Sequence, residues 1–99
     1  MRIIELDASG CATPKQFAAA LREAIEALPG HGSSVESFVD SMIFGTMSNV
    51  APPYTVRVTG LAGETEKFAQ RLAGALGQAR LEHRTRSGED IEVVLQIAR

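Results

Sequence analysis

Short apolar segments of strand-like pattern, separated by stretches of helical periodicity, constrain the fold of this chain most. Strands are predicted over 2–7, 54–59 and 91–97, and the last two alternate as in a sheet that buries one face. Helices between consecutive strands imply parallel pairing with right-handed crossovers. The sequence therefore predicts a small α/β fold with a three-stranded parallel sheet and packed helices in two layers.

The predicted order of elements is strand-helix-helix-strand-helix-strand, within a single domain over residues 1–99. Helical periodicity predicts helices over about 13–28 and 64–82, with a shorter one over 33–45 between them. In the last helix, Gly74 and Gly77 suggest close packing or a bend, because glycine weakens a helix by roughly 1 kcal/mol relative to alanine.

The short helix carries the most informative pattern. Ser33 is its candidate N-cap, and Glu36 lies three residues further on, at the spacing of a capping box. Asp40 follows four residues after Glu36, so the two carboxylates share one face of the helix. Asp40 has no capping role and is a poor helix former in mid-helix, which makes it a candidate functional residue. Beside this face runs an apolar stripe of Val35, Phe38, Val39 and Met42.

Charge is unevenly distributed along the chain. Between Arg22 and Arg57 there is no lysine or arginine, although four acids fall in that window. The window predicts a negative surface potential, which favours a basic partner protein or is simply a solvated acidic face. The formal net charge of −2 does not indicate a nucleic-acid-binding protein.

No residue set typical of an enzyme, a metal site or a cofactor site is recognisable. Cys11 is the only cysteine, and it, His31 and His83 are far apart and lack metal-ligand spacing. Spacing alone favours a solvated helix face for Glu36 and Asp40 over a catalytic pair, because a general acid needs a pKa raised by burial. We therefore expect neither catalysis, nor a metal, nor a cofactor.

Two loops and the cysteine content complete the expectations. His31, between two glycines, is interpreted either as a binding residue or as an exposed loop histidine. The turn Gly60–Gly63 lies where a phosphate loop would occur but lacks a Walker spacing, so a plain turn is favoured. A lone cysteine excludes an internal disulfide and favours the cytoplasm, and no apolar run has the length of a membrane span.

The acidic helix and the residues before it resemble the barstar family, the intracellular inhibitors of barnase-type ribonucleases. The resemblance rests on Leu28-Pro29, a short glycine-containing loop, and Val35-Glu36-Ser37-Phe38-Val39-Asp40-Ser41-Met42. It covers nearly the whole chain and is weakest over 60–87. In that family the acidic helix and the preceding loop plug the ribonuclease active site, where carboxylates take the place of substrate phosphates.

The resemblance implies a non-enzymatic, cytoplasmic inhibitor of a basic ribonuclease-type protein, without nucleic-acid, membrane or metal binding. By position, the second family aspartate falls on Asp40 and the first on Glu36. Val39 stands at a family tryptophan. A small-ligand or regulatory module of the same α/β fold is the alternative. The residues assigned to partner binding are Asp40, Glu36, His31, Gly32, Val39 and Phe44.

Overall fold

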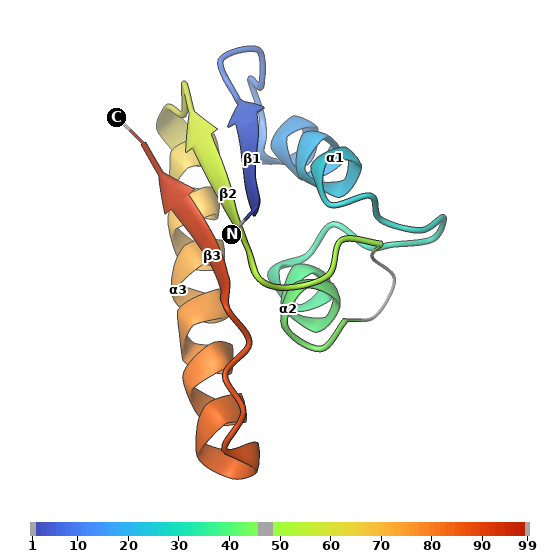
Figure 1. Ribbon diagram of the computed structural model, residues 1–99. Helices are drawn as coiled ribbons and strands as arrows, with labels where there is room; N and C mark the ends of the chain where they lie inside the picture. The colour runs from blue at the N-terminus through green and yellow to red at the C-terminus, as the bar shows by residue number, and fades with distance from the viewer. Residues whose placement is uncertain (1, 46–48, 99) are drawn as a thin grey trace.

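A three-stranded parallel sheet organises the structure, as the order of elements predicts. The computed structural model describes residues 2–45 and 49–98. The strands are β1 (Arg2–Asp7), β2 (Tyr54–Thr59) and β3 (Val93–Ile97). Each pairs in parallel with the next along the chain, in the order β1-β2-β3 (Figure 1).

Three helices connect the strands. They are α1 (Pro14–Ala24), α2 (Val35–Ile43) and α3 (Gly63–Ser87). With α1 and α2 before β2 and α3 after it, the predicted order of elements is confirmed. The predicted start of α1 is also confirmed, because the Gln16 N–H donates to the Thr13 side chain at 3.2 Å.

The end of α1 comes earlier than predicted, at Ala24 rather than near Leu28. Glu26 adopts a left-handed conformation with φ of 54°, which few residues other than glycine take. The N–H of Ala27 then donates to the Arg22 carbonyl at 2.9 Å, as in the Schellman motif that ends many helices. The chain therefore turns before Pro29 and Gly30, residue types that commonly follow the end of a helix.

The end of α3 comes later than predicted, at Ser87 rather than near Glu82. Gly88, with φ of 76°, caps the helix and donates its N–H to the Arg84 carbonyl at 2.8 Å. Asp90 then accepts two hydrogen bonds from Arg80, at 2.7 and 2.8 Å, which fix the return towards β3 and lower the pKa of Asp90. The polar residues before Gly88 thus belong to the helix rather than to a turn.

The two glycines inside α3 do not mark close packing. A Cβ built on Gly74 or Gly77 meets nothing within 4 Å, so both residues lie in open space. The expectation of close packing is therefore wrong at both positions. Figure 1 shows α3 running along the sheet and projecting beyond the start of the strands.

The sheet buries one face against the helices and leaves the other in solvent. Val56, in the central strand, is completely buried, whereas its neighbour Thr55 lies in an outward row with Ile3 and Val94. The helices on the covered face meet each other, because the Phe17 ring of α1 packs edge-on against the Phe68 ring of α3 at 6.1 Å. The predicted two-layer arrangement is confirmed.

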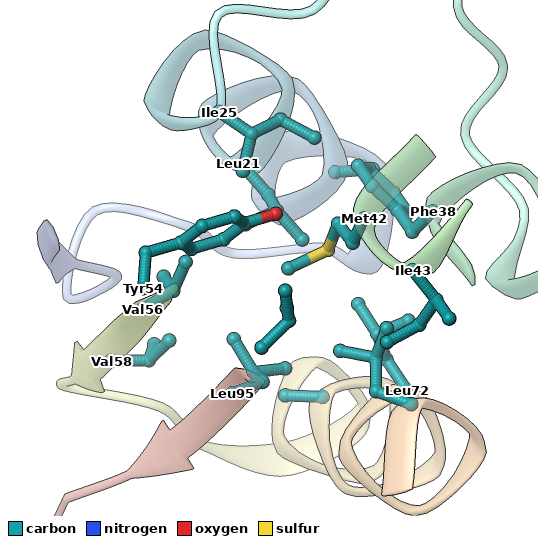
Figure 2. Close-up of a cluster of buried hydrophobic side chains, with 14 of the residues drawn as sticks. Leu21, Ile25, Phe38, Met42, Ile43, Tyr54, Val56, Val58, Leu72 and Leu95 are labelled. Carbon is teal, nitrogen blue, oxygen red and sulfur yellow. The ribbon is translucent and has the colours of Figure 1, made fainter. Parts of the chain in front are cut away.

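Tyr54 is the largest fully buried side chain of the core, with an exposed fraction of 0%. Its ring extends from β2 to the region of Leu21 on α1 and of Ile25, which follows α1 (Figure 2). The hydroxyl has no hydrogen-bond partner among the described residues. Burial disfavours the tyrosinate anion and raises the pKa of Tyr54 to about 12.

Because Tyr54 is buried, we expect the folded protein to lose stability at alkaline pH through this residue. Tyr54 is the only tyrosine in the chain, so the ultraviolet absorbance of tyrosinate reports on it alone. We expect ionisation near pH 12 in the folded protein, against about 10 in the unfolded chain. Between these values the unfolded state binds fewer protons, so the free energy of unfolding falls as pH rises.

Tyr54→Phe should remove this alkaline pH dependence. At neutral pH it should change the free energy of unfolding by no more than about 1 kcal/mol, since the hydroxyl has no described partner to lose. Urea unfolding at several pH values measures both effects. Ionisation of the folded protein near pH 10, or a large loss of stability in Tyr54→Phe, would contradict this account.

Candidate functional site

The start of α2 is fixed by Ser34 rather than by the predicted Ser33. The Ser37 N–H donates to the Ser34 hydroxyl at 3.1 Å, whereas the Ser33 hydroxyl is hydrogen-bonded to the Arg22 guanidinium. The predicted capping box with Glu36 is therefore wrong, because the third position from the cap is Ser37. Glu36 still lies in the first turn, where the helix dipole favours an anion.

The apolar side of α2 packs into the core. Phe38 has an exposed fraction of 0% and Met42 one of 1%, and α2 lies against α3. Glu36 and Asp40 fall on the neighbouring side of the helix and are both exposed. The predicted arrangement of two carboxylates beside an apolar stripe is present in the structure.

An open hollow of about 290 Å³ lies between α2 and α3 on this exposed side, next to their contact. Its apolar lining comes from two valines of α2 and two alanines of α3. Its polar lining consists of Glu36 and Asp40 on α2 and Gln78 and Glu82 on α3. The apolar residues are Val35, Val39, Ala75 and Ala79.

Glu82 is a third carboxylate at this hollow and was not among the predicted site residues. Its place depends on the packing of α3 against α2, which no local pattern specifies. One sequence signal is available. Ala75, Ala79 and residue 82 follow the spacing of a single helix face, so Glu82 lies next to the two alanines on α3. Gln78 donates its side-chain N–H to Glu82 at 3.2 Å and so restricts the orientation of that carboxylate.

The basic residues around the site are unequally placed. Among residues 2–45 and 49–98, no lysine or arginine lines the hollow and no ion pair involves Glu36, Asp40 or Glu82. Arg71 lines an adjacent hollow with Glu36, and its guanidinium lies 5.9 Å from the centre of the Phe68 ring. Arg71 therefore lies beside Glu36, whereas the charged side chains that are described as lining the hollow are all acidic.

His31 is half-buried and holds the preceding loop against α2. Its Nδ1 lies 2.6 Å from the Gly32 carbonyl oxygen and its Nε2 lies 2.7 Å from the Ser41 hydroxyl. The ring also packs on Phe38, with 5.1 Å between ring centres. The interpretation as an exposed loop histidine is therefore wrong, because three contacts bind the ring to neighbouring residues.

The other assigned residues lie apart from the hollow. Gly32 is exposed, and a Cβ there would lie 2.5 Å from the Ser37 hydroxyl oxygen, so its lack of a side chain lets the loop approach α2. Phe44 follows α2 with an exposed fraction of 55%, and its ring centre lies 5.9 Å from that of His83. The structure thus brings Glu36, Val39 and Asp40 together and places the remaining residues around α2.

The turn at Gly60–Gly63 is packed against the loop after β1. A Cβ on Gly60 would lie 2.7 Å from the Ser9 backbone nitrogen. Among residues 2–45 and 49–98, those lining the hollow beside this turn include Glu66 and no lysine or arginine. These features are unfavourable for a phosphate ligand, which needs positive charge or free backbone donors.

Within the described part of the chain, no three histidine, cysteine, aspartate or glutamate side chains gather closely enough to hold a metal ion. No helix found there has the length and apolar character needed to cross a membrane.

No protein-family model matches the chain, and no curated protein matches it at a significant level. The chemistry of the site follows from its geometry and charge. Among the described residues no carboxylate is buried, so none lies in the desolvated environment typical of a general acid. Three exposed carboxylates around an apolar floor are instead suited to attracting a cationic group.

The cap of α2 provides a test of this local structure. Ser34→Ala should lower the free energy of unfolding by about 1 kcal/mol, because it removes the acceptor for the Ser37 N–H. Ser33→Ala is the matched control and should cost less than about 0.5 kcal/mol, since its bond to Arg22 is exposed. Urea unfolding of both variants measures the difference, and the reverse order would restore Ser33 as the cap.

Proposed function

We propose that the protein is a barstar-like inhibitor that binds the basic active site of a ribonuclease-type enzyme. The observation that carries this proposal is the set of Glu36, Asp40 and Glu82 around a hollow that no basic side chain of the described residues lines. The resemblance of the segment 28–42 to the acidic helix and loop of barstar proteins supports the same function.

The physical basis is the replacement of substrate phosphates by carboxylates. A ribonuclease binds a polyanion, so its active site presents arginine and lysine side chains with hydrogen-bond donors. Exposed carboxylates on a rigid helix are hydrogen-bond acceptors that carry the same negative charge as the substrate phosphates. Complementary potentials also accelerate encounter, in a manner that weakens as salt is added.

The structure of α2 suits this role because its geometry is set before binding. Ser34 caps the helix, Phe38 anchors it in the core, and His31 joins the preceding loop to Ser41. A surface that is already ordered loses little conformational entropy when a partner binds. A non-enzymatic, cytoplasmic inhibitor is consistent with the single cysteine and with the absence of a buried carboxylate among the described residues.

The small-ligand alternative has less support. It would use the strand-to-helix turn after β2, where Gly60 is packed against Ser9 and the adjacent hollow contains Glu66. The acidic hollow between α2 and α3 instead offers both charge and shape for a protein partner. We therefore place the functional surface at α2.

Asp40 is the first residue to test. Asp40→Asn should weaken binding to a barnase-type ribonuclease by more than about 2 kcal/mol, because it leaves positive charges of the enzyme buried without a counter-charge. Isothermal titration calorimetry and inhibition of RNA cleavage measure the loss. The matched control is Glu5→Gln, which removes an exposed carboxylate paired with Arg57 at 3.6 Å on the sheet.

Equal loss in the Asp40 and Glu5 variants would indicate a general charge effect. Unchanged binding in Asp40→Asn would remove the central residue of the proposal. A wild-type chain that fails to bind the ribonuclease would leave the proposed function without support.

Glu82 should contribute as a member of the same surface. Glu82→Gln should weaken ribonuclease binding by about 1 kcal/mol, less than Asp40→Asn, since a carboxylate at the margin stays closer to water. Stopped-flow measurements should show slower association as salt increases, with a smaller salt dependence in the variant. An association rate independent of salt would contradict the role of charge at this surface.

A further inference from the structure

The free edge of the sheet at β3 has the features of a strand that pairs with another chain. We propose that β3 pairs in antiparallel orientation with β3 of a second copy of this protein, so that the two sheets join across a two-fold axis at Leu95. The inference goes beyond the proposed function and does not rest on it, because the surface lies at the edge of the sheet and not at α2.

The edge formed by β3 is unprotected. Among residues 2–45 and 49–98, β3 pairs only with β2, and the register of that pair is continuous. The five residues Val93–Ile97 include neither a charged residue nor a proline. Sheets usually protect such an edge with charges, prolines or bulges, because its unpaired N–H and C=O groups are a template for a further strand. The lack of these features at β3 therefore points to a partner strand.

The opposite edge of the sheet has the protection that β3 lacks. Of the six residues of β1, Arg2, Glu5 and Asp7 are charged. Arg2 also forms an ion pair at 3.6 Å with Glu26, which follows α1. A further strand at this edge would have to be accommodated beside these charges, so β3 is the edge that is suited to pairing.

Alternate residues of β3 direct their backbone groups away from the sheet. The Tyr54 N–H donates to the Glu92 carbonyl at 2.9 Å, so the even-numbered residues of this segment face β2. Leu95 and Ile97 therefore direct their N–H and C=O groups to the free edge. An antiparallel strand centred on Leu95 is in the register that meets these groups.

The sequence of β3 matches itself in this register. On the covered face, Val93 of one copy lies beside Ile97 of the other, and Leu95 lies beside its own equivalent. On the open face, Val94 lies beside Gln96 of the second copy. No like charges meet, and the half-buried Ile97 side chain gains an apolar neighbour.

The charges on α3 beside β3 are complementary for the same two-fold axis. Near the end of β3, Glu66 lines a hollow with Ile97. Near its start, Arg80 bonds to Asp90 at 2.7 Å, and Arg84 lies about one helical turn further on. A two-fold axis reverses the direction of α3, so the acidic end of one copy faces the basic end of the other. This complementarity favours a second copy over an unrelated strand.

Sedimentation equilibrium and hydrogen exchange test the association. We expect a monomer–dimer equilibrium with a Kd of roughly 100 µM, since one strand pair is smaller than a standard interface. Between about 10 µM and about 1 mM protein, exchange of the Leu95 and Ile97 amides should slow roughly fourfold. The Val94 and Gln96 amides face β2 and should already be protected at the lower concentration. A monomer at about 1 mM, or Leu95 exchange that does not depend on concentration, would overturn the proposal.

Charged side chains on the open face of β3 test the register. Val94→Lys/Gln96→Lys puts lysines directly opposite each other across the axis and should weaken self-association at least roughly tenfold. Val94→Glu/Gln96→Glu should do the same, and an equimolar mixture of the two variants should pair again. Ile3→Lys, at an exposed position of β1, is the control and should leave the dimer unchanged.

Circular dichroism identifies a double variant that fails to fold, in which case the exposed single change Gln96→Lys takes its place. A folded variant that associates as tightly as the wild-type protein would contradict the pairing through β3. A mixture of the lysine and glutamate variants that stays monomeric would contradict the proposed register.

Discussion

The burial of Phe38 and Met42 in the core, on the helix α2 that lies against α3, determines where the charged groups of the site lie. Both side chains are buried, and their four-residue spacing fixes the rotation of α2 about its axis. Glu36 and Asp40, offset by two residues from these anchors, must then lie outside the core. The same contact brings Glu82 of α3 to the acidic face of α2, so core packing and surface charge have one origin.

The loop before α2 is fixed by hydrogen bonds that both protonation states of His31 can form. The Gly32 carbonyl can only accept, so Nδ1 carries a proton, and in the neutral ring Nε2 accepts from the Ser41 hydroxyl. In the charged ring Nε2 donates instead, and Ser41 can donate to the Phe38 carbonyl at 3.3 Å. The loop is therefore held against α2 in either form of the ring.

Local patterns predicted β1, β2 and the acidic helix well, β3 begins at Val93 rather than Ile91, and the cap of α2 was missed where two adjacent signals compete. β1 and β2 have the predicted bounds because apolar content and alternation need no distant partner. The cap of α2 was misplaced by one residue because Ser33 and Ser34 are equally good acceptors in sequence. Glu82 was missed because its place depends on packing between helices that are far apart in the chain.

The difference between the two carboxylates of α2 explains why Asp40 is the more informative residue. Glu36 has local compensation, since it lies in the first turn of the helix and near Arg71. Asp40 has neither: it lies in the interior of the helix, where its propensity is poor, and no basic residue among those described lines its hollow. An exposed acid at such a position lowers helix stability without a local return, and for this reason we propose Asp40 as the first residue to meet a cationic group of a partner.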